Sequence, residues 1–139
     1  MNKIRTSISD IYIDDDGILR VVMHPAADMT LEKLKENFEA IKQLLGNNRA
    51  LVLINTKTSF KFRSEARSYA AINEGTINRV ATAFVVNSFA NKLIVNLYIK
   101  FNKPVVPTRM FLSEENALKW LKTFFVMPGD DCLKPGKKK

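Results

Sequence analysis

The possible folds of this chain are limited most by two uninterrupted apolar runs of strand length, ALVLIN (residues 50–55) and VATAFVV (residues 80–86). Such a run is typical of a strand that is covered on both faces or lies centrally in a sheet. Residues 108–112 form a third apolar strand, and helical segments lie between the three runs. Alternating strands and helices after residue 30 therefore predict parallel pairing with right-handed crossovers.

The beginning of the chain predicts a β-hairpin. In DIYIDDDGILRVVMH (residues 10–24), apolar runs flank Asp14-Asp15-Asp16-Gly17, whose residue types suit a tight turn. With the later strands, this hairpin predicts an α/β fold that has a mixed sheet of about five strands and flanking helices. The aspartates do not have the alternating oxygens and closing glutamate of a calcium loop, so we expect no metal there.

Four segments predict helices through apolar spacing and capping residues. The first covers residues 31–45, where apolar residues recur at three and four positions, and the others cover residues 65–74, 89–101 and 114–124. Pro104 and Pro107 close the third helix. The expected caps and stops are Asp28 or Thr30, Gly46, Ser64, Ser88 and Ser113.

The length of 139 residues predicts one domain, residues 1–126, followed by a flexible basic tail, residues 127–139. The net charge of +8 suggests nucleic-acid binding, but four of the positive charges are Lys134, Lys137, Lys138 and Lys139 in the tail. We interpret the tail as a solvated segment, with contact to an anionic surface or to nucleic acid as the alternatives. Nucleic acid is thus not the expected partner.

The sequence predicts a cytoplasmic, non-enzymatic protein. No apolar run reaches the roughly 18 residues of a membrane span, and MNKIRTSISD does not resemble a secretory signal. The only histidine, His24, precedes a proline at a strand end, and the only cysteine, Cys132, lies in the tail, so no nucleophile–histidine pair is expected. Phosphate loops, dinucleotide fingerprints and metal-ligand spacings do not occur, so we expect no cofactor.

The order of elements and two long segments carry a family resemblance. LVLINTKTSFKFRSEARSYAA and ATAFVVNSFANKLIVNLYIKFNKPVVPTRMFLSEENALKWLKTF resemble STAS-like, SpoIIAA-like domains, and particularly a group of small uncharacterised bacterial proteins common among Bacteroidetes. This resemblance implies a regulatory or ligand-binding role without catalysis. The pattern P-x-R-x-F-x-x-x-x-x-A-x-x-W-L of that group, mostly a packing feature, is matched at Pro107, Arg109, Phe111, Ala117, Trp120 and Leu121.

The same resemblance raises an alternative function for Ser64. In the anti-sigma-factor antagonists of the wider superfamily, a serine at the start of the corresponding helix is phosphorylated to switch partner binding. The surrounding sequence here is FRSEA rather than an Asp-Ser-Ser-Gly-like motif. Ser64 is therefore either a switch or a plain helix cap.

Two surfaces are candidate binding sites. The first is the edge beyond the carboxyl ends of the parallel strands, where helix N-termini and basic side chains suit an anion or an acidic partner, although capped helices with solvated lysines would look alike. Its residues are Thr56, Lys61, Arg63, Ser64, Asn87 and Ser88.

The second surface is the helix over residues 89–101, which is apolar around most of its circumference. We expect Leu93, Leu97 and Tyr98 to pack on the sheet, leaving apolar surface that is buried by neighbouring elements, forms a homodimer or lines an apolar-ligand pocket. The candidate residues for the dimer or ligand surface are Ile94, Leu97, Tyr98, Ile99 and Phe101.

Overall fold

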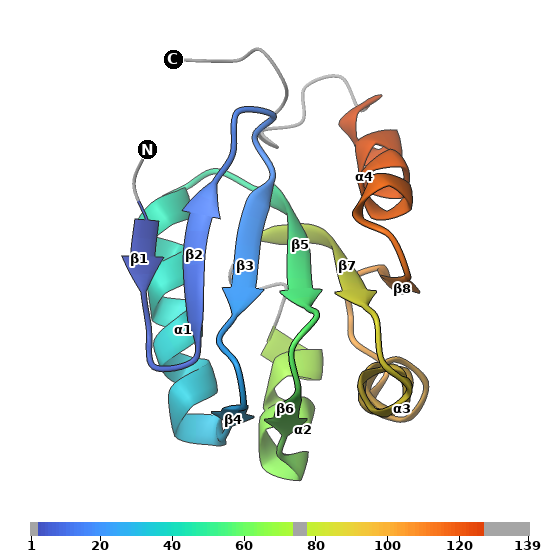
Figure 1. Cartoon of the computed structure of the whole chain (residues 1–139). Coiled ribbons are helices and arrows are strands. Elements are labelled where there is room, and N and C mark those ends of the chain that lie inside the picture. The colour runs from blue at the N-terminus through green and yellow to red at the C-terminus, as the bar shows by residue number, and fades with distance from the viewer. Residues whose placement is uncertain (1–2, 74–77, 127–139) are drawn as a thin grey trace.

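The computed structural model of the protein describes residues 3–73 and 78–126, which form a six-stranded mixed sheet with flanking helices (Figure 1). The strand order is β1-β2-β3-β5-β7-β8. β1, β2 and β3 pair antiparallel, whereas β3, β5, β7 and β8 pair parallel. The strands are β1 (Lys3–Arg5), β2 (Ser9–Ile13), β3 (Leu19–Met23), β5 (Ala50–Thr56), β7 (Arg79–Val86) and β8 (Thr108–Phe111).

The helices follow the predicted order and confirm the mixed α/β fold. They are α1 (Leu31–Leu45), α2 (Ser64–Asn73), α3 (Phe89–Leu97) and α4 (Glu114–Lys122). The predicted helix over residues 89–101 changes its pitch, because α3 continues into the π-helical turn η2 (Tyr98–Asn102). The 3-10 turn η3 (Thr123–Val126) extends α4.

Three short strands are not predicted from the sequence. β1 adds an edge to the hairpin, and β4 (Ala27–Met29) pairs in parallel with β6 (Phe60–Phe62) in a separate two-stranded sheet. β6 lies in the segment between the predicted strand over residues 50–55 and the predicted helix over residues 65–74. Phe60 and Phe62 are buried while Lys61 is exposed, so β6 does alternate, but three residues are too few for that period to stand out.

The hairpin turn and the N-caps of three helices form as predicted. The Asp14 carboxylate accepts the backbone N–H groups of Asp16 and Ile18, and Gly17 has a φ of 81°, which explains the glycine. Hydroxyl oxygens accept backbone N–H groups at the starts of α1, α3 and α4. These three N-caps are Thr30, Ser88 and Ser113.

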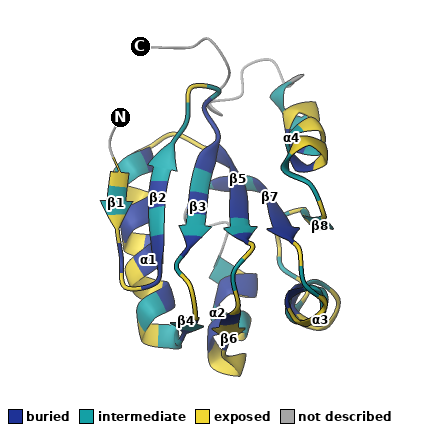
Figure 2. Ribbon diagram, viewed as in Figure 1, coloured by how far each residue is buried: buried dark blue, intermediate teal, exposed yellow. Residues whose placement is uncertain are grey.

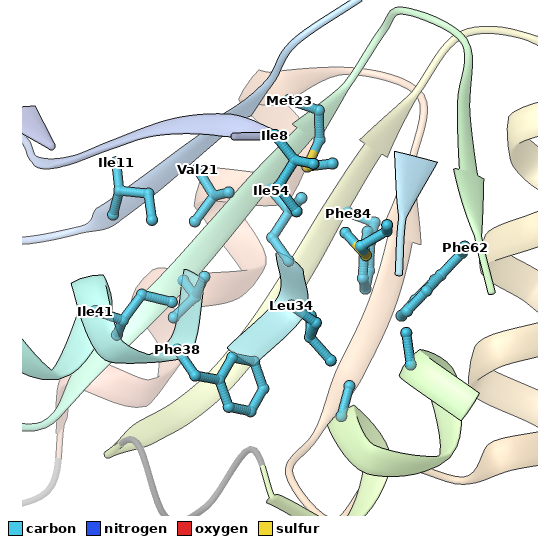
Figure 3. Packing of buried hydrophobic residues seen from close by; sticks show 14 of the residues in the cluster. Ile8, Ile11, Val21, Met23, Leu34, Phe38, Ile41, Ile54, Phe62 and Phe84 are labelled. Atoms are coloured by element: carbon cyan, nitrogen blue, oxygen red, sulfur yellow. The ribbon is translucent and has the colours of Figure 1, made fainter. Parts of the chain in front are cut away.

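Each face of the sheet has its own hydrophobic cluster. The larger one lies between the sheet and α1, α2 and the inner side of α3, and Figure 3 shows Val21, Ile54 and Phe84 of the strands facing Phe38 and other residues of α1. The smaller cluster lies under α4, whose Ala117 and Leu121 are fully buried. In Figure 1, α1 lies behind β1, β2 and β3, and α4 lies on the opposite side near β7 and β8.

Candidate functional site

α3 turns one side to the core and the other to solvent. In Figure 1 it is seen nearly end-on beneath β7, so its axis crosses the strand direction at the carboxyl ends of the parallel strands. Its buried residues are Asn91 and Val95, and Tyr98, the first residue of η2, is buried as well. Figure 2 shows exposed residues on the outer side of the same helix.

Asn91 ties the first turn of α3 to the loop after β5. Its buried side-chain amide donates to the backbone carbonyl oxygen of Thr56 and, at 2.9 Å, to that of Thr58. Its backbone N–H donates to the Ser88 hydroxyl at 3.1 Å. Because a buried carbonyl without a partner is costly, these bonds fix which side of α3 faces inward.

Tyr98 holds the other end of the helix. Its ring is fully buried, with ring centroids 5.1 Å from Phe62 and 6.0 Å from Phe84. A large aromatic side chain in such a cluster contributes much of the local packing energy. α3 is thus held at both ends, by a polar side chain at one and by an aromatic ring at the other.

The outer side of α3 and η2 carries four large apolar residues spaced four apart, which we call the α3 row. Phe89, Leu93, Leu97 and Phe101 are 74%, 55%, 41% and 74% exposed. Residues four apart on a helix lie along one line on its surface. With about 150–250 Å² for a whole large side chain, the row presents on the order of 500 Å² of apolar surface, which is at the upper end for a monomer.

A polar row runs beside the α3 row. Lys92, Asn96 and Lys100 also recur every fourth residue, and each directly precedes a member of the α3 row in the sequence. Lys103 lies two residues after the last member of the row. Lys100 and Lys103 are exposed, and Lys92 is half-buried. Residues 75–113 contain no aspartate or glutamate, although the whole chain has 14. The segment that carries the α3 row is therefore apolar and basic.

The structure corrects the predicted composition of this surface. Tyr98 is fully buried and cannot contact a partner, while Ile94 and Ile99 are half-buried against the larger core cluster. Leu97 is exposed instead of packing on the sheet, and so is Leu93. The four-residue spacing of the row was visible in the sequence, but no local signal showed that a polar asparagine would take the inward position.

Some side chains of the predicted anion edge make hydrogen bonds within the fold, and others are exposed. The Thr56 hydroxyl is buried and donates to the Val85 carbonyl oxygen at 2.9 Å, and the Ser88 hydroxyl caps α3. Asn87 and Lys61 are exposed. The strands bring these residues to the same edge, but two of the side chains are already used to hold the fold.

Arg63 and Ser64 lie at the start of α2. The Arg63 guanidinium donates two hydrogen bonds to the Asp28 carboxylate, at 2.8 and 2.7 Å, and thereby lowers the pKa of Asp28. Ser64 is exposed and is the first residue of α2, whereas the Arg63 carbonyl accepts the first helical N–H, from Arg67. The predicted cap position is therefore wrong by one residue.

The six residues of the P-x-R-x-F pattern form a packing unit. Ala117 and Leu121 are buried on the inner side of α4, and the rings of Phe111 and Trp120 lie 5.7 Å apart. The Arg109 guanidinium lies 5.0 and 5.7 Å from the centres of these two rings, so it stacks on aromatic faces. The carbonyl of Pro107 accepts the N–H of Thr82 at 2.9 Å.

Among the described residues, the titratable groups with shifted pKa values lie in ion pairs. Asp10 on β2 accepts hydrogen bonds from Arg5 and His24, which lower its pKa to about 2. No group of three or more metal-ligating side chains occurs in residues 3–73 and 78–126. The predicted tail, including Cys132, lies outside the described residues.

A small internal cavity lies between the sheet, α1 and α2. Its volume is about 20 Å³, room for about one water molecule, and its walls are mostly apolar side chains, including Phe38, Phe84 and Tyr98. No helix in the described part of the chain has the length and apolar character needed to cross a membrane.

Comparisons with known proteins place this fold. A family model described as Domain of unknown function (DUF7793) matches residues 11–125. An uncharacterized DUF3478-family protein from Shewanella loihica PV-4, described as having a SpoIIAA-like fold, is similar with a TM-score of 0.54 and 14% identity over 87% of this chain and 98% of that chain. That likeness confirms the SpoIIAA-like fold; the Bacteroidetes-type group stays a prediction.

A protein of unknown function from Arthrobacter sp. FB24 is 23% identical over 81% of this chain and 92% of that chain, with a TM-score of 0.32. No curated protein matches the sequence.

Proposed function

The chain belongs to the DUF7793 family, and we propose that it is a non-enzymatic module that binds a protein partner through the α3 row. The observation that carries this proposal is the outward position of four large apolar residues on a helix whose inner side is already held by Asn91 and Tyr98. Apolar patches of this size on a monomer commonly mark interaction sites.

The size of the internal cavity favours a protein partner over an apolar small molecule. Drug-sized ligands occupy pockets of about 300–1,000 Å³, whereas this cavity holds about 20 Å³. A lipid-like ligand would have to separate α1 or α2 from the sheet. The α3 row needs no such rearrangement, because its residues are exposed.

The use of the titratable groups supports a role without catalysis. The Arg5, Asp10 and His24 network joins β1, β2 and the end of β3, and the Arg63–Asp28 pair joins α2 to β4. Arg20 donates to both Asp14 and Glu114 and so connects the hairpin to α4. A carboxylate held at low pKa by arginine is a poor general base near neutral pH.

A homodimer through α3, expected from the sequence, stays a prediction with a different set of residues. A stable dimer buries about 800 Å² on each partner, whereas the α3 row presents on the order of 500 Å². Further surface would have to join the contact. In an antiparallel symmetric pair the lysines beside the row would also meet their own copies, so we propose a separate partner and treat self-association as a competing result.

A second candidate function is a phosphorylation switch at Ser64. One observation favours it: Ser64 is exposed in the first turn of α2, where the helix dipole and backbone N–H groups stabilise a phosphate. Phosphate at Ser64 in natively expressed protein, together with a changed partner for Ser64→Asp but not for Ser68→Asp on the same helix, is the expected result. Intact-mass spectra without phosphate would count against it.

The main proposal is tested in the source organism by affinity capture with three versions of the full chain: unchanged, Leu93→Asp, and Gln43→Asp as a control. Gln43 is exposed on α1, which lies near β1 and β2 at the opposite edge of the sheet from α3 (Figure 1). We expect one protein to be retained by the unchanged and Gln43→Asp chains and lost with Leu93→Asp, and to bind again when both proteins are purified. Binding that ignores Leu93, or turnover abolished by one substitution, would refute the proposal.

A further inference from the structure

We infer that the α3 row binds an amphipathic helix of a partner protein that carries acidic residues along one flank of its apolar face. The inference rests on the proposed docking function and adds the chemistry of the partner segment. It follows from the charges beside the row, from their one-sided arrangement and from the area of the row.

The charge of the surface selects an acidic partner. Lys92 and Lys100 border the α3 row and Lys103 follows it, while residues 75–113 supply no carboxylate to neutralise them. At a rise of about 1.5 Å per residue, Lys92 and Lys100 lie about 12 Å apart along the helix. Acidic residues seven or eight positions apart on a partner helix would face both of them.

The lysines lie on only one side of the row. On the other side the helix turns into the core, where Ile94 is half-buried and Val95 fully buried. A helix with acids on one flank matches this arrangement in one orientation, so charge would set the direction of docking. An anionic membrane meets both sides of a helix equally and gains nothing from one-sided charge.

A second copy of the chain matches the row less well. In an antiparallel symmetric pair, each flank of one helix lies against the same flank of its copy, so lysines would meet lysines. The row presents on the order of 500 Å², less than the about 800 Å² of a stable dimer's share. An amphipathic helix that lays its apolar anchors into a surface of this size is a common mode of recognition.

The test uses three synthetic helical peptides with the same leucine face and with glutamate, glutamine or lysine on one flank. They are titrated into the isotope-labelled full chain and followed by NMR. The glutamate peptide should shift signals of residues 89–101 and bind about tenfold more tightly than the glutamine peptide at low salt, because two exposed ion pairs form. The lysine peptide should bind most weakly, and high salt should reduce these differences.

Charge reversal supplies the decisive variant. Lys92→Glu with Lys100→Glu should invert the preference, so that the lysine peptide binds best, while Lys42→Glu with Lys119→Glu, on α1 and α4, should leave the preference unchanged. The circular dichroism spectrum and melting temperature of each variant establish that it is folded. Leu93→Asp should abolish binding of all three peptides.

The possible outcomes separate this inference from the proposed function. Equal binding of the three peptides overturns the acidic partner but agrees with docking through the row. Absence of any shift at residues 89–101, protection of the row by anionic vesicles alone, or self-association that covers the row overturns the inference. The proposed function is then judged separately by the dependence of the captured partner on Leu93.

Discussion

Helices α3 and α4 both follow a parallel strand, both begin after a serine N-cap and both span nine residues. Yet α3 buries a polar side chain, Asn91, beside Val95, whereas α4 buries only the apolar Ala117 and Leu121. α4 buries Ala117 and Leu121 and exposes charges, with acids in its first turn and lysines in its last. α3 has neither and leaves most of its apolar residues outside. Apolar content alone therefore does not tell which side of a helix faces the core.

The difference lies in what holds each helix. α4 is held by a conventional apolar stripe over the smaller core cluster. α3 is held by the Asn91 amide, the buried Val95 side chain and the Tyr98 ring, so the exposed residues of the α3 row are not required for the fold. This comparison predicts which substitutions change stability and which change only binding.

The largest expected effect is that of Tyr98→Ala. Loss of a fully buried aromatic ring between Phe62 and Phe84 should lower the free energy of unfolding by about 3–5 kcal/mol. Leu93→Ala, in the exposed row, should change it by less than about 0.5 kcal/mol. Urea denaturation measures both, and similar costs for the two would mean that α3 is oriented differently.

Asn91→Ala should have the next largest effect. It leaves the carbonyls of Thr56 and Thr58 without their amide donor, which should cost about 1–3 kcal/mol. The matched control is Asn96→Ala, on the polar row of the same helix, for which we expect almost no change. If both asparagines can be replaced without loss, then the polar anchor of α3 is not what orients it.

The ordinary signals in the sequence predicted most of the fold. Uninterrupted apolar runs and the spacing of apolar residues identified β5, β7, β8 and the helices, since both patterns follow directly from burial. The three-residue strands β1, β4 and β6 are too short to show a period. The Asn91 side chain is decisive for α3, but its partners lie 33 and 35 residues away, and no local pattern reveals such pairs.

The candidate sites were predicted less well for the same reason. Thr56 and Ser88 stand at the expected edge, but their hydroxyls hold Val85 and Asn91. Leu97 and Tyr98 are neighbours in sequence, but Leu97 is exposed and Tyr98 is buried. Only the packing of Tyr98 against Phe62 and Phe84 reveals this difference.

The region around α3 should also differ from the remainder in its response to acid. The pKa of Asp10 is lowered to about 2, so its contribution to stability is present above the unfolded pKa near 3.8 and is lost as the pH falls through about 2. Asp10→Asn should weaken this acid dependence. The loss of unfolding free energy caused by Tyr98→Ala should stay the same at pH 7 and at about pH 3, inside the interval in which Asp10 loses its contribution, because residues 75–113 carry no carboxylate. A cost that changes over this interval would contradict the comparison.

The smallest expected difference concerns the two serine caps. Ser88→Ala and Ser113→Ala each remove one hydroxyl acceptor and should each cost about 1 kcal/mol. Similar losses of stability in thermal denaturation would show that the N-caps of α3 and α4 contribute equally. The two helices would then differ in the residues that face the core and not in their N-caps. A much larger cost at Ser88 would show that the cap, and not Asn91 or Tyr98, positions α3.

The most direct measurement is NMR of the Leu93 and Leu97 methyl groups with a soluble paramagnetic agent, in dilute protein before and after addition of the glutamate-flanked peptide. The account predicts strong broadening of both leucines in the protein alone, none of comparable size for Leu121 beneath α4, and protection of Leu93 and Leu97 when the peptide binds. Methyl groups of Leu93 and Leu97 that are already protected in the dilute protein would contradict an open binding surface on α3.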